Sequence, residues 1–207
     1  MAITKQESQN QVAQPHSRLI RLIAIVLLAL IVIVGLTILI IWLTIKPKKL
    51  VYYIDAGSIH GYNLTNGNHL DASYYFLLRA YNPNKKVSVY YDKVDVSVKY
   101  DDEVVSRGII NPFYQPKRNT TLFKLNLASH DVILPDETAR HLKVDRSSGQ
   151  VELGVNVRAK LRFKVGMWKS RHYRMKVWCA PIMVHLSSSY KGVQKTTFQS
   201  VKCDVDF

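Results

Sequence analysis

The side chains that could do chemistry in this 207-residue chain form no familiar catalytic or metal-binding pattern. The seven histidines lack metal-ligand spacing, and the two cysteines do not form a CxxC pair. The sequence contains neither a glycine-rich phosphate loop nor a nucleophile elbow. The acidic run Asp101-Asp102-Glu103 falls in a predicted turn, where solvated carboxylates are expected. We therefore expect a protein that is not an enzyme, uses no cofactor and holds no metal.

Basic side chains give the strongest chemical signal. Residues 153–202 include 11 Lys or Arg and no Asp or Glu. The alternation along 151–165 places four cations on one exposed face of a predicted strand, and the basic run 169–176 is expected beside it as a hairpin partner. The four predicted face residues are Arg158, Lys160, Arg162 and Lys164.

Two interpretations of these basic residues stay open. Cations along a sheet discourage edge-to-edge aggregation, so the face can be solvated and protective only. A large field of one sign also attracts polyanions, which predicts that the face binds an acidic surface. For a domain outside the cell, acidic cell-wall polysaccharide or anionic lipid headgroups are the natural partners. Nucleic acid is not expected despite the pI of about 9.8, because no nucleic-acid-binding motif accompanies the charge.

One apolar segment is long enough to cross a lipid bilayer. Residues 22–45 contain no charged side chain, and a helix of these 24 residues would span about 36 Å, against about 30 Å of hydrocarbon. A cleaved signal peptide is disfavoured, because the run is too long and is followed by Lys46-Pro47-Lys48-Lys49 rather than by small residues. A soluble core helix would need a polar face. We predict a disordered tail over 1–17, a transmembrane anchor over 18–46 and one domain over 47–207.

Charge beside the predicted anchor does not set its orientation. Arg18 and Arg21 precede the apolar run, and Lys46, Lys48 and Lys49 follow it. The positive-inside rule compares such residues on the two sides of the membrane, and here they nearly balance. Other signals are needed to orient the chain.

Two such signals favour a domain outside the cytosol. The segments beginning at Asn63 (Asn-Leu-Thr) and Asn119 (Asn-Thr-Thr) are acceptor sequons for N-glycosylation. Cys179 and Cys203 are compatible with one disulfide in an oxidising compartment, or with two separate buried thiols. We therefore expect a cytosolic N-terminus and an extracellular C-terminal domain.

Period-two alternation of apolar and polar residues dominates the chain after the anchor. It is clearest from Val151 to Val165, which forms either one long strand or a strand that bends and changes sheet near Gly154. Further strands are predicted at 50–60, 73–81, 86–91, 94–100, 120–127, 172–179 and 197–206, and a short helical turn at 135–143. This spacing predicts a mainly β fold, in which a single transmembrane α-helix precedes an antiparallel two-sheet β-sandwich of about immunoglobulin size.

Four short sequence blocks occur in order between the anchor and the last residue. The first is Asn82-Pro83-Asn84-Lys85-Lys86 followed by Tyr90-Tyr91-Asp92, and the second is Asn111-Pro112-Phe113-Tyr114-Gln115 leading to Asn119. The third is Arg162-Phe163-Lys164-Val165-Gly166, and the fourth runs from Lys202 to Phe207. Together the blocks resemble the plant harpin-induced-like or non-race-specific disease resistance-like family, whose members carry a late embryogenesis abundant group 2 (LEA-2) domain.

The resemblance implies a fibronectin-like β-sandwich with no catalytic residues. It also implies a family cysteine pair, here Cys179 and Cys203, and an anchor in the plasma membrane or at plasmodesmata. Family members act in plant defence and stress signalling. The resemblance names no ligand, receptor or oligomeric state.

The first block itself has two interpretations. Asn82, Pro83 and Asn84 could form a recognition loop, but a turn between two strands is favoured, since proline fixes φ and asparagines bond to nearby backbone. Tyr90 and Tyr91, which precede Asp92, are expected to point to opposite faces of a strand.

The combined expectation is a non-enzymatic plant protein, anchored in the plasma membrane, whose sandwich faces the apoplast and acts in defence or stress signalling. One alternative is a tether that joins the membrane to the cell wall through the basic residues. Another is a cytosol-facing module that binds anionic lipid.

Overall fold

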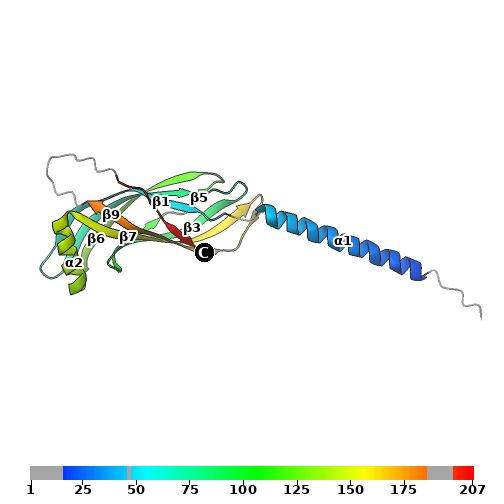
Figure 1. The fold of residues 1–207 in the computed structure, drawn as a ribbon, viewed down its shortest axis with the longest axis horizontal. Helices are drawn as coiled ribbons and strands as arrows, with labels where there is room; N and C mark the ends of the chain where they lie inside the picture. The colour runs from blue at the N-terminus through cyan, green and yellow to red at the C-terminus, as the bar shows by residue number, and fades with distance from the viewer. Residues whose placement is uncertain (1–15, 46–47, 186–197) are drawn as a thin grey trace, which may run out of the picture. The chain divides into compact units, whose positions relative to one another are not determined.

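The computed structural model describes three stretches of the chain, residues 16–45, 48–185 and 198–207. The chain divides into two compact units, residues 1–46 and 47–207 (Figure 1). The first unit contains helix α1 (His16–Ile45), and the second contains every strand and helix α2 (Asp136–Ser148). Of the predicted tail over 1–17, residues 1–15 lie outside the described residues, and His16 and Ser17 belong to α1.

Helix α1 carries Arg18 and Arg21 near its start and is apolar on all sides after them. Its segment Arg18–Ile40 has 23 residues and a mean hydropathy of 3.4, and none of it is buried against other parts of the protein. A helix of this length spans about 35 Å, which is enough for the hydrocarbon of a bilayer. Because a helix with no polar face has no stable place on the surface of a soluble protein, α1 is the candidate membrane anchor.

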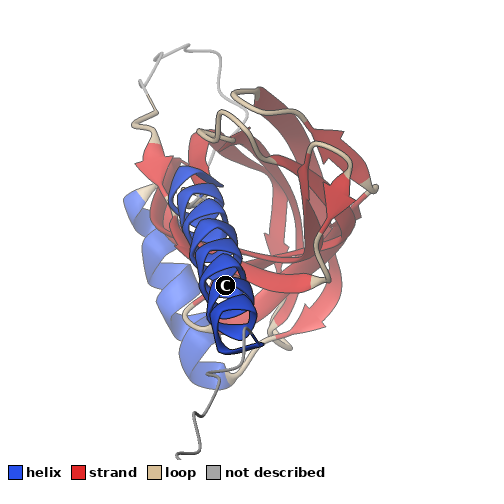
Figure 2. Ribbon diagram, turned by 90° about the vertical axis from the view of Figure 1, so that its right-hand side faces the viewer, coloured by secondary structure: helices blue, strands red, loops and turns tan. Residues whose placement is uncertain are grey.

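The strands form two antiparallel sheets, drawn in red as two layers in Figure 2. The first sheet has the order β10 (Val201–Lys202), β1 (Val51–Leu64), β2 (His69–Tyr81) and β6 (Thr120–Ile133). The second sheet has the order β11 (Asp204–Asp206), β9 (Tyr173–His185), β7 (Gln150–Val165), β3 (Ser88–Tyr100) and β4 (Glu103–Ile110). Two short strands complete it, since β5 (Phe113–Gln115) pairs with β3 and β8 (Trp168–Lys169) pairs with β7. The mainly β, two-sheet prediction is confirmed, whereas a fibronectin or immunoglobulin arrangement stays a prediction.

The hydrophobic core lies between the two sheets and follows from the alternation along each strand. In β7 the buried residues are Val151, Leu153, Val155, Val157, Ala159 and Leu161. Each fully buried Val or Leu stabilises the fold by about 1.5–3 kcal/mol relative to an exposed one. The residues between them point to the opposite side, so β7 is the single long strand of the two alternatives, and it presents a row of polar side chains to solvent.

Two predicted strands, 86–91 and 94–100, form one strand in the structure. Strand β3 is continuous because Asp92 is the extra residue of a β-bulge: pairing with β7 passes from Tyr91 directly to Lys93. The bulge shifts the alternation by one residue, so the sequence pattern is interrupted although the strand is not.

Strand β4 is absent from the predicted set for a similar reason. Val105 is an extra residue opposite β3, so that Val105 and Ser106 are both buried and the period of two is lost. Strand β9 also continues to His185, past the predicted end at 179. The predicted helical turn at 135–143 is the first part of α2, which ends at Gly149 in the left-handed conformation.

The C-terminal segment joins the two sheets along one side. Strand β10 pairs with β1 in the first sheet, and β11 pairs with β9 in the second, so the chain crosses between sheets at Cys203. The backbone N–H of Cys203 donates to the carbonyl of Tyr52 at 3.0 Å, and its sulfur forms a disulfide with Cys179 of β9. The disulfide expected from the family resemblance is therefore present, and it ties β9 to the crossing segment.

Candidate functional site

The predicted cations lie side by side on the outer surface of the second sheet. In β7 they alternate with buried residues, and the neighbouring strands add further cations in register. Arg158 faces Lys176, and Lys160 faces Arg174, both in β9. The predicted hairpin partner 169–176 is thus divided between β8 and β9. We call the following residues the basic face: Arg158, Lys160, Arg162, Lys164, Lys169, Arg174 and Lys176.

Like charges stand directly opposite each other across this face. Lys164 faces Lys169, and Lys160 lies between Arg174 on one side and Lys93 of β3 on the other. Directly opposed side chains of an antiparallel pair have Cβ atoms about 4.5–5.5 Å apart, and like charges there are destabilising. An anion bound over the face would relieve this repulsion.

Arg162 is the one member of the basic face that forms an ion pair within the described part of the chain. Its Nε donates to Asp92 Oδ2 at 2.9 Å, and its terminal nitrogen donates to the other carboxylate oxygen. His172 Nε2 lies 3.4 Å from Asp92 as well. Hydrogen bonds from Arg162 hold the pKa of Asp92 below its ordinary value. The bulge in β3 thus serves to aim Asp92 at Arg162, and this cation is already neutralised.

Carboxylates flank only one part of the basic face. Asp95 of β3 stands opposite Arg158 and pairs with Lys93 at 3.0 Å, and Asp206 of β11 stands opposite Lys176. Toward β8 the face has no such neighbours in register, and Lys164 and Lys169 face each other there. The positive charge is therefore least compensated at the β8 side.

Tyr90 positions two cations at this side of the face. Its ring centroid lies 5.9 Å from Lys164 Nζ and 4.8 Å from Lys169 Nζ. The ring of Tyr114 packs against it with centroids 4.6 Å apart. Cation–π attraction of this kind contributes about 0.5–1 kcal/mol at exposed sites. Tyr90 points outward and Tyr91 inward, as the alternation predicts.

A groove continues the face across β3 and β4. It has a volume of about 740 Å³. Its lining includes the cations Lys93, Lys99, Arg107 and Arg158 and the single carboxylate Asp95. The groove therefore offers a concave positive surface beside the flat one, which suits an extended polyanion.

The Asn-Pro-Asn block is buried and has a structural part. Asn82 is 0% exposed and Asn84 4%. The Asn82 amide donates to the carbonyls of Val87 and Pro116, and its oxygen accepts from Asn84. The Asn84 side chain donates to the Lys48 carbonyl at 2.9 Å and accepts from the Lys48 N–H at 2.7 Å. These amides close one end of the sandwich, so their side chains are not available to a ligand.

The second block supplies a buried polar network. Tyr91 donates to Gln115 Oε1 at 3.2 Å, and its hydroxyl lies 2.5 Å from that of Tyr52. Gln115 in turn donates to the carbonyls of Ala80 and Asn119. Burial raises the pKa of both tyrosines, so their hydroxyls stay protonated and serve as fixed hydrogen-bonding groups. The network links the two sheets and carries no acid–base chemistry at neutral pH.

The two sequons differ in accessibility. Asn63 is exposed near the end of β1, in the hairpin that leads to β2. Asn119 is half-buried, and its backbone carbonyl accepts from Asn82 and Gln115. Asn63 is thus the better placed acceptor. Among the residues that the structure describes, no group of three or more His, Cys, Asp or Glu is arranged to hold a metal ion.

Known proteins with similar sequences place the chain in a family. A family model described as late embryogenesis abundant protein (LEA_2) matches residues 77–179. An uncharacterised protein of Arabidopsis thaliana is 36% identical over 176 residues, which cover 84% of this chain and 79% of the relative. NDR1/HIN1-like protein 10 of Arabidopsis thaliana is 30% identical over 191 residues, which cover 91% of this chain and 84% of the relative. One solved structure, of a protein from Archaeoglobus fulgidus, aligns with a TM-score of 0.31 at 12% identity over 59% of this chain and 93% of that chain, too low a score to carry an argument about fold.

The fold and the site together define a class of protein: a two-sheet β domain with a basic outer face, in a chain that also has an apolar helix able to span a bilayer. The chain belongs to the NDR1/HIN1-like family of plant proteins with an LEA_2 domain. This family is linked to plant defence and stress. The expectation drawn from the four sequence blocks is thereby confirmed.

Proposed function

We propose that this protein is a non-enzymatic, single-pass plasma-membrane protein whose sandwich lies outside the cytosol and binds acidic cell-wall polysaccharide in defence or stress signalling. The observation that carries the proposal is the set of opposed cations on the basic face, above all the row Lys93, Lys160 and Arg174. A polymer of uronic acids carries regularly spaced carboxylates, and it would replace repulsion across the strands by attraction. Such binding would join the wall to the membrane.

Two features support a location of the domain outside the cytosol. The disulfide between Cys179 and Cys203 is of a kind that persists in oxidising compartments. Asn63 offers an exposed sequon near the end of β1. The apolar helix α1 supplies the anchor.

Polysaccharide binding is tested with the full chain in nanodiscs of neutral lipid. The variant Arg158→Gln, Lys160→Gln, Lys164→Gln removes three cations of the basic face but keeps Arg162, which holds Asp92. We expect the wild type to be retained on immobilised polygalacturonate at low salt and the variant to lose most of that retention. The control Lys124→Gln, Arg140→Gln, Lys143→Gln removes the same charge from exposed positions on β6 and α2. Equal retention of the two variants would overturn the proposal.

Orientation is tested separately by expression in plant microsomes. N-glycan removal should increase the mobility of the wild type, and Asn63→Gln should abolish most of this shift, while Asn119→Gln has a smaller effect. An unshifted protein whose sandwich is cleaved by protease added to the cytosolic side would overturn the external location. It would favour the cytosol-facing lipid-binding alternative.

A further inference from the structure

One end of the sandwich is built from segments that contain cations and no acidic residue, and Asp92 of β3 lies at its edge, 3.4 Å from His172. Four segments form this end, residues 48–50, 82–88, 111–121 and 163–173, and none of them contains Asp or Glu. Their basic residues are Lys48, Lys49, Lys85, Lys86, Lys117, Arg118, Lys164, Lys169 and Arg171. We call this the Lys48 end. Lys164 and Lys169 also belong to the basic face, whereas the other seven residues lie outside it, in segments between strands.

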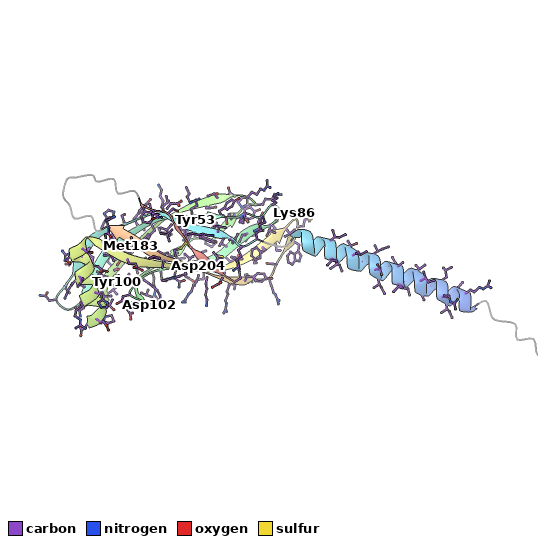
Figure 3. The ribbon with its side chains drawn as sticks, viewed as in Figure 1. Tyr53, Lys86, Tyr100, Asp102, Met183 and Asp204 are labelled. Carbon is purple, nitrogen blue, oxygen red and sulfur yellow. A yellow bond between two sulfur atoms is a disulfide. The ribbon has the colours of Figure 1, made fainter. Side chains whose placement is uncertain are left out.

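Hydrogen bonds and strand pairing bring the four segments together. The Asn84 side chain bonds to Lys48, and the Arg118 N–H donates to the Asn84 carbonyl at 3.1 Å. Ser88, which begins β3, stands opposite Lys164 near the end of β7. Figure 3 labels Lys86 at this end of the domain and Tyr100 at the opposite end. The nine cations therefore share one end of the fold although they are far apart in sequence.

A rigid hairpin with an apolar tip projects at the same end. Gly166 turns the chain with φ of 57°, and Val165 pairs with Trp168. Two hydrogen bonds close the hairpin: the Ser170 N–H donates to the Phe163 carbonyl at 2.8 Å, and the Phe163 N–H donates to the Ser170 hydroxyl at 2.9 Å. Met167 at the tip is 100% exposed and Trp168 64%. Water-exposed Met and Trp side by side on an ordered turn point to a partner that takes apolar groups.

The flanks of the tip are cationic and unpaired. Lys164, Lys169 and Arg171 surround Met167 and Trp168 in sequence, and none of the three forms an ion pair with a carboxylate in the described stretches of the chain. An apolar tip ringed by cations matches the chemistry of a membrane surface. Trp favours the interface between headgroups and acyl chains, and each Lys or Arg near anionic lipid contributes favourably.

We propose that the Lys48 end seats on the phosphate headgroups of the leaflet from which the chain emerges, with Met167 and Trp168 inserted among the lipids. Chain length favours this partner over others. Three peptide steps separate Ile45, the last residue of α1, from Lys48, and these span at most about 11 Å. A surface held so close is present at high effective concentration, so that weak contacts suffice to bind it. The proposal rests on the membrane anchoring of the proposed function, but it holds for either side of the membrane and does not depend on polysaccharide binding.

The test follows Trp168 in the full chain assembled in nanodiscs. The chain has three tryptophans, so Trp42→Phe with Trp178→Phe leaves Trp168 as the only indole. The discs contain phosphatidylcholine with or without phosphatidylserine, and the lipids carry bromine on the acyl chains as a quencher. We expect Trp168 to be blue-shifted and strongly quenched in discs with phosphatidylserine. High salt should remove most of the quenching.

Two matched variants make the result decisive. Trp42→Phe with Trp168→Phe leaves Trp178, which stands opposite Asn156 on the outer sheet surface away from the hairpin, and this indole should not be quenched. Adding Lys164→Gln, Lys169→Gln and Arg171→Gln to the Trp168 protein should abolish most of its quenching, and the same three changes in the Trp178 protein should leave its signal unchanged. Solvent-like emission from Trp168 in every disc would overturn the proposal. The proposal would also be overturned by Trp168 emission that is blue-shifted but not quenched by the brominated lipids, if the shift grows with the number of chains per disc. That result would indicate that the tip contacts a second copy of the chain.

Discussion

The two ends of the sandwich differ in whether their charged side chains have partners within the chain. At the end that carries Tyr100, the carboxylates have partners within the chain: Lys99 Nζ lies 3.6 Å from Asp102, His141 lies 2.9 Å from Asp101, and Tyr100 donates to Asp145 at 2.8 Å. There too Asn68 donates to Asp136 at 2.6 Å, which fastens α2 to the β1–β2 turn. At the Lys48 end the described loops contain no acidic residue at all. Contacts within the chain satisfy the carboxylates of the first end, whereas the four segments of the Lys48 end contain no carboxylate that could pair with their cations.

Buried amides rather than ion pairs therefore close the Lys48 end. Removing one of these amides should give the largest effect on stability and so tests the contrast between the two ends most directly. Asn84→Ala removes the side-chain bonds to Lys48 and leaves the oxygen of Asn82 with fewer donors. We expect a loss of about 2–3 kcal/mol in the free energy of unfolding, since buried polar groups are left unpaired. Urea titration with pulse proteolysis of the full chain in nanodiscs measures it.

The matched control is Asn126→Ala on the exposed side of β6. This change should stay within about 0.5 kcal/mol of the wild type. Equal losses for the two variants would mean that the Asn-Pro-Asn block does not hold this end together.

The ion pair between Arg162 and Asp92 gives the next largest effect and a dependence on pH. Because the pKa of Asp92 is lowered in the folded protein, its contribution is complete above the ordinary Asp value of about 3.9 and is lost as the pH falls through the lower folded value. Arg162→Gln should lower the free energy of unfolding at pH 7 by less than Asn84→Ala does, and it should flatten the acid limb of the stability curve. Arg158→Gln, on the same strand without an ion pair, should leave the acid limb intact. The same acid limb in both variants would contradict this role of Arg162.

The smallest expected effect is an increase in the free energy of unfolding. Lys160 stands between Lys93 and Arg174, so Lys160→Glu exchanges two repulsive neighbours for attractive ones and should stabilise the fold by about 0.5 kcal/mol. The same change should weaken retention on polygalacturonate. Lys124→Glu, which faces Leu77, should change neither quantity. If Lys160→Glu lowered the stability instead, repulsion from Lys93 and Arg174 would not be the dominant electrostatic interaction of Lys160.

Local patterns were enough to predict the regular parts of this fold. The alternation from Val151 to Val165 marks β7 and its buried side, and the charge-free run to Ile45 marks α1. Both signals can be read from neighbouring residues. Burial alternates with a period of two along a strand, and the length of an apolar run can be compared with the thickness of a bilayer. The four cations of β7 could therefore be placed on one face before any partner strand was known.

Features that depend on distant residues could not be predicted in this way. The bulge at Asp92 is stabilised by Arg162, which is 70 residues away in the chain. The polarity of the Lys48 end is divided among four segments, each of which contains only two or three cations and none of which stands out by itself. Strand β4 is hidden because Val105 breaks its alternation. In each case the pattern exists only once the strands are paired.

The bonds between Lys48 and Asn84 also have a mechanical consequence. In a protein that holds a wall polymer through one unit and a bilayer through the other, tension enters the sandwich at Lys48. The amide of Asn84 is then the first group to bear the load, and β1 follows it. Strand β1 is paired with β2 from Val51 to Leu64, so a pull along its axis loads these hydrogen bonds together in shear instead of opening them one at a time. A sandwich tethered at Lys48 and pulled along β1 would therefore resist the load through many hydrogen bonds at once.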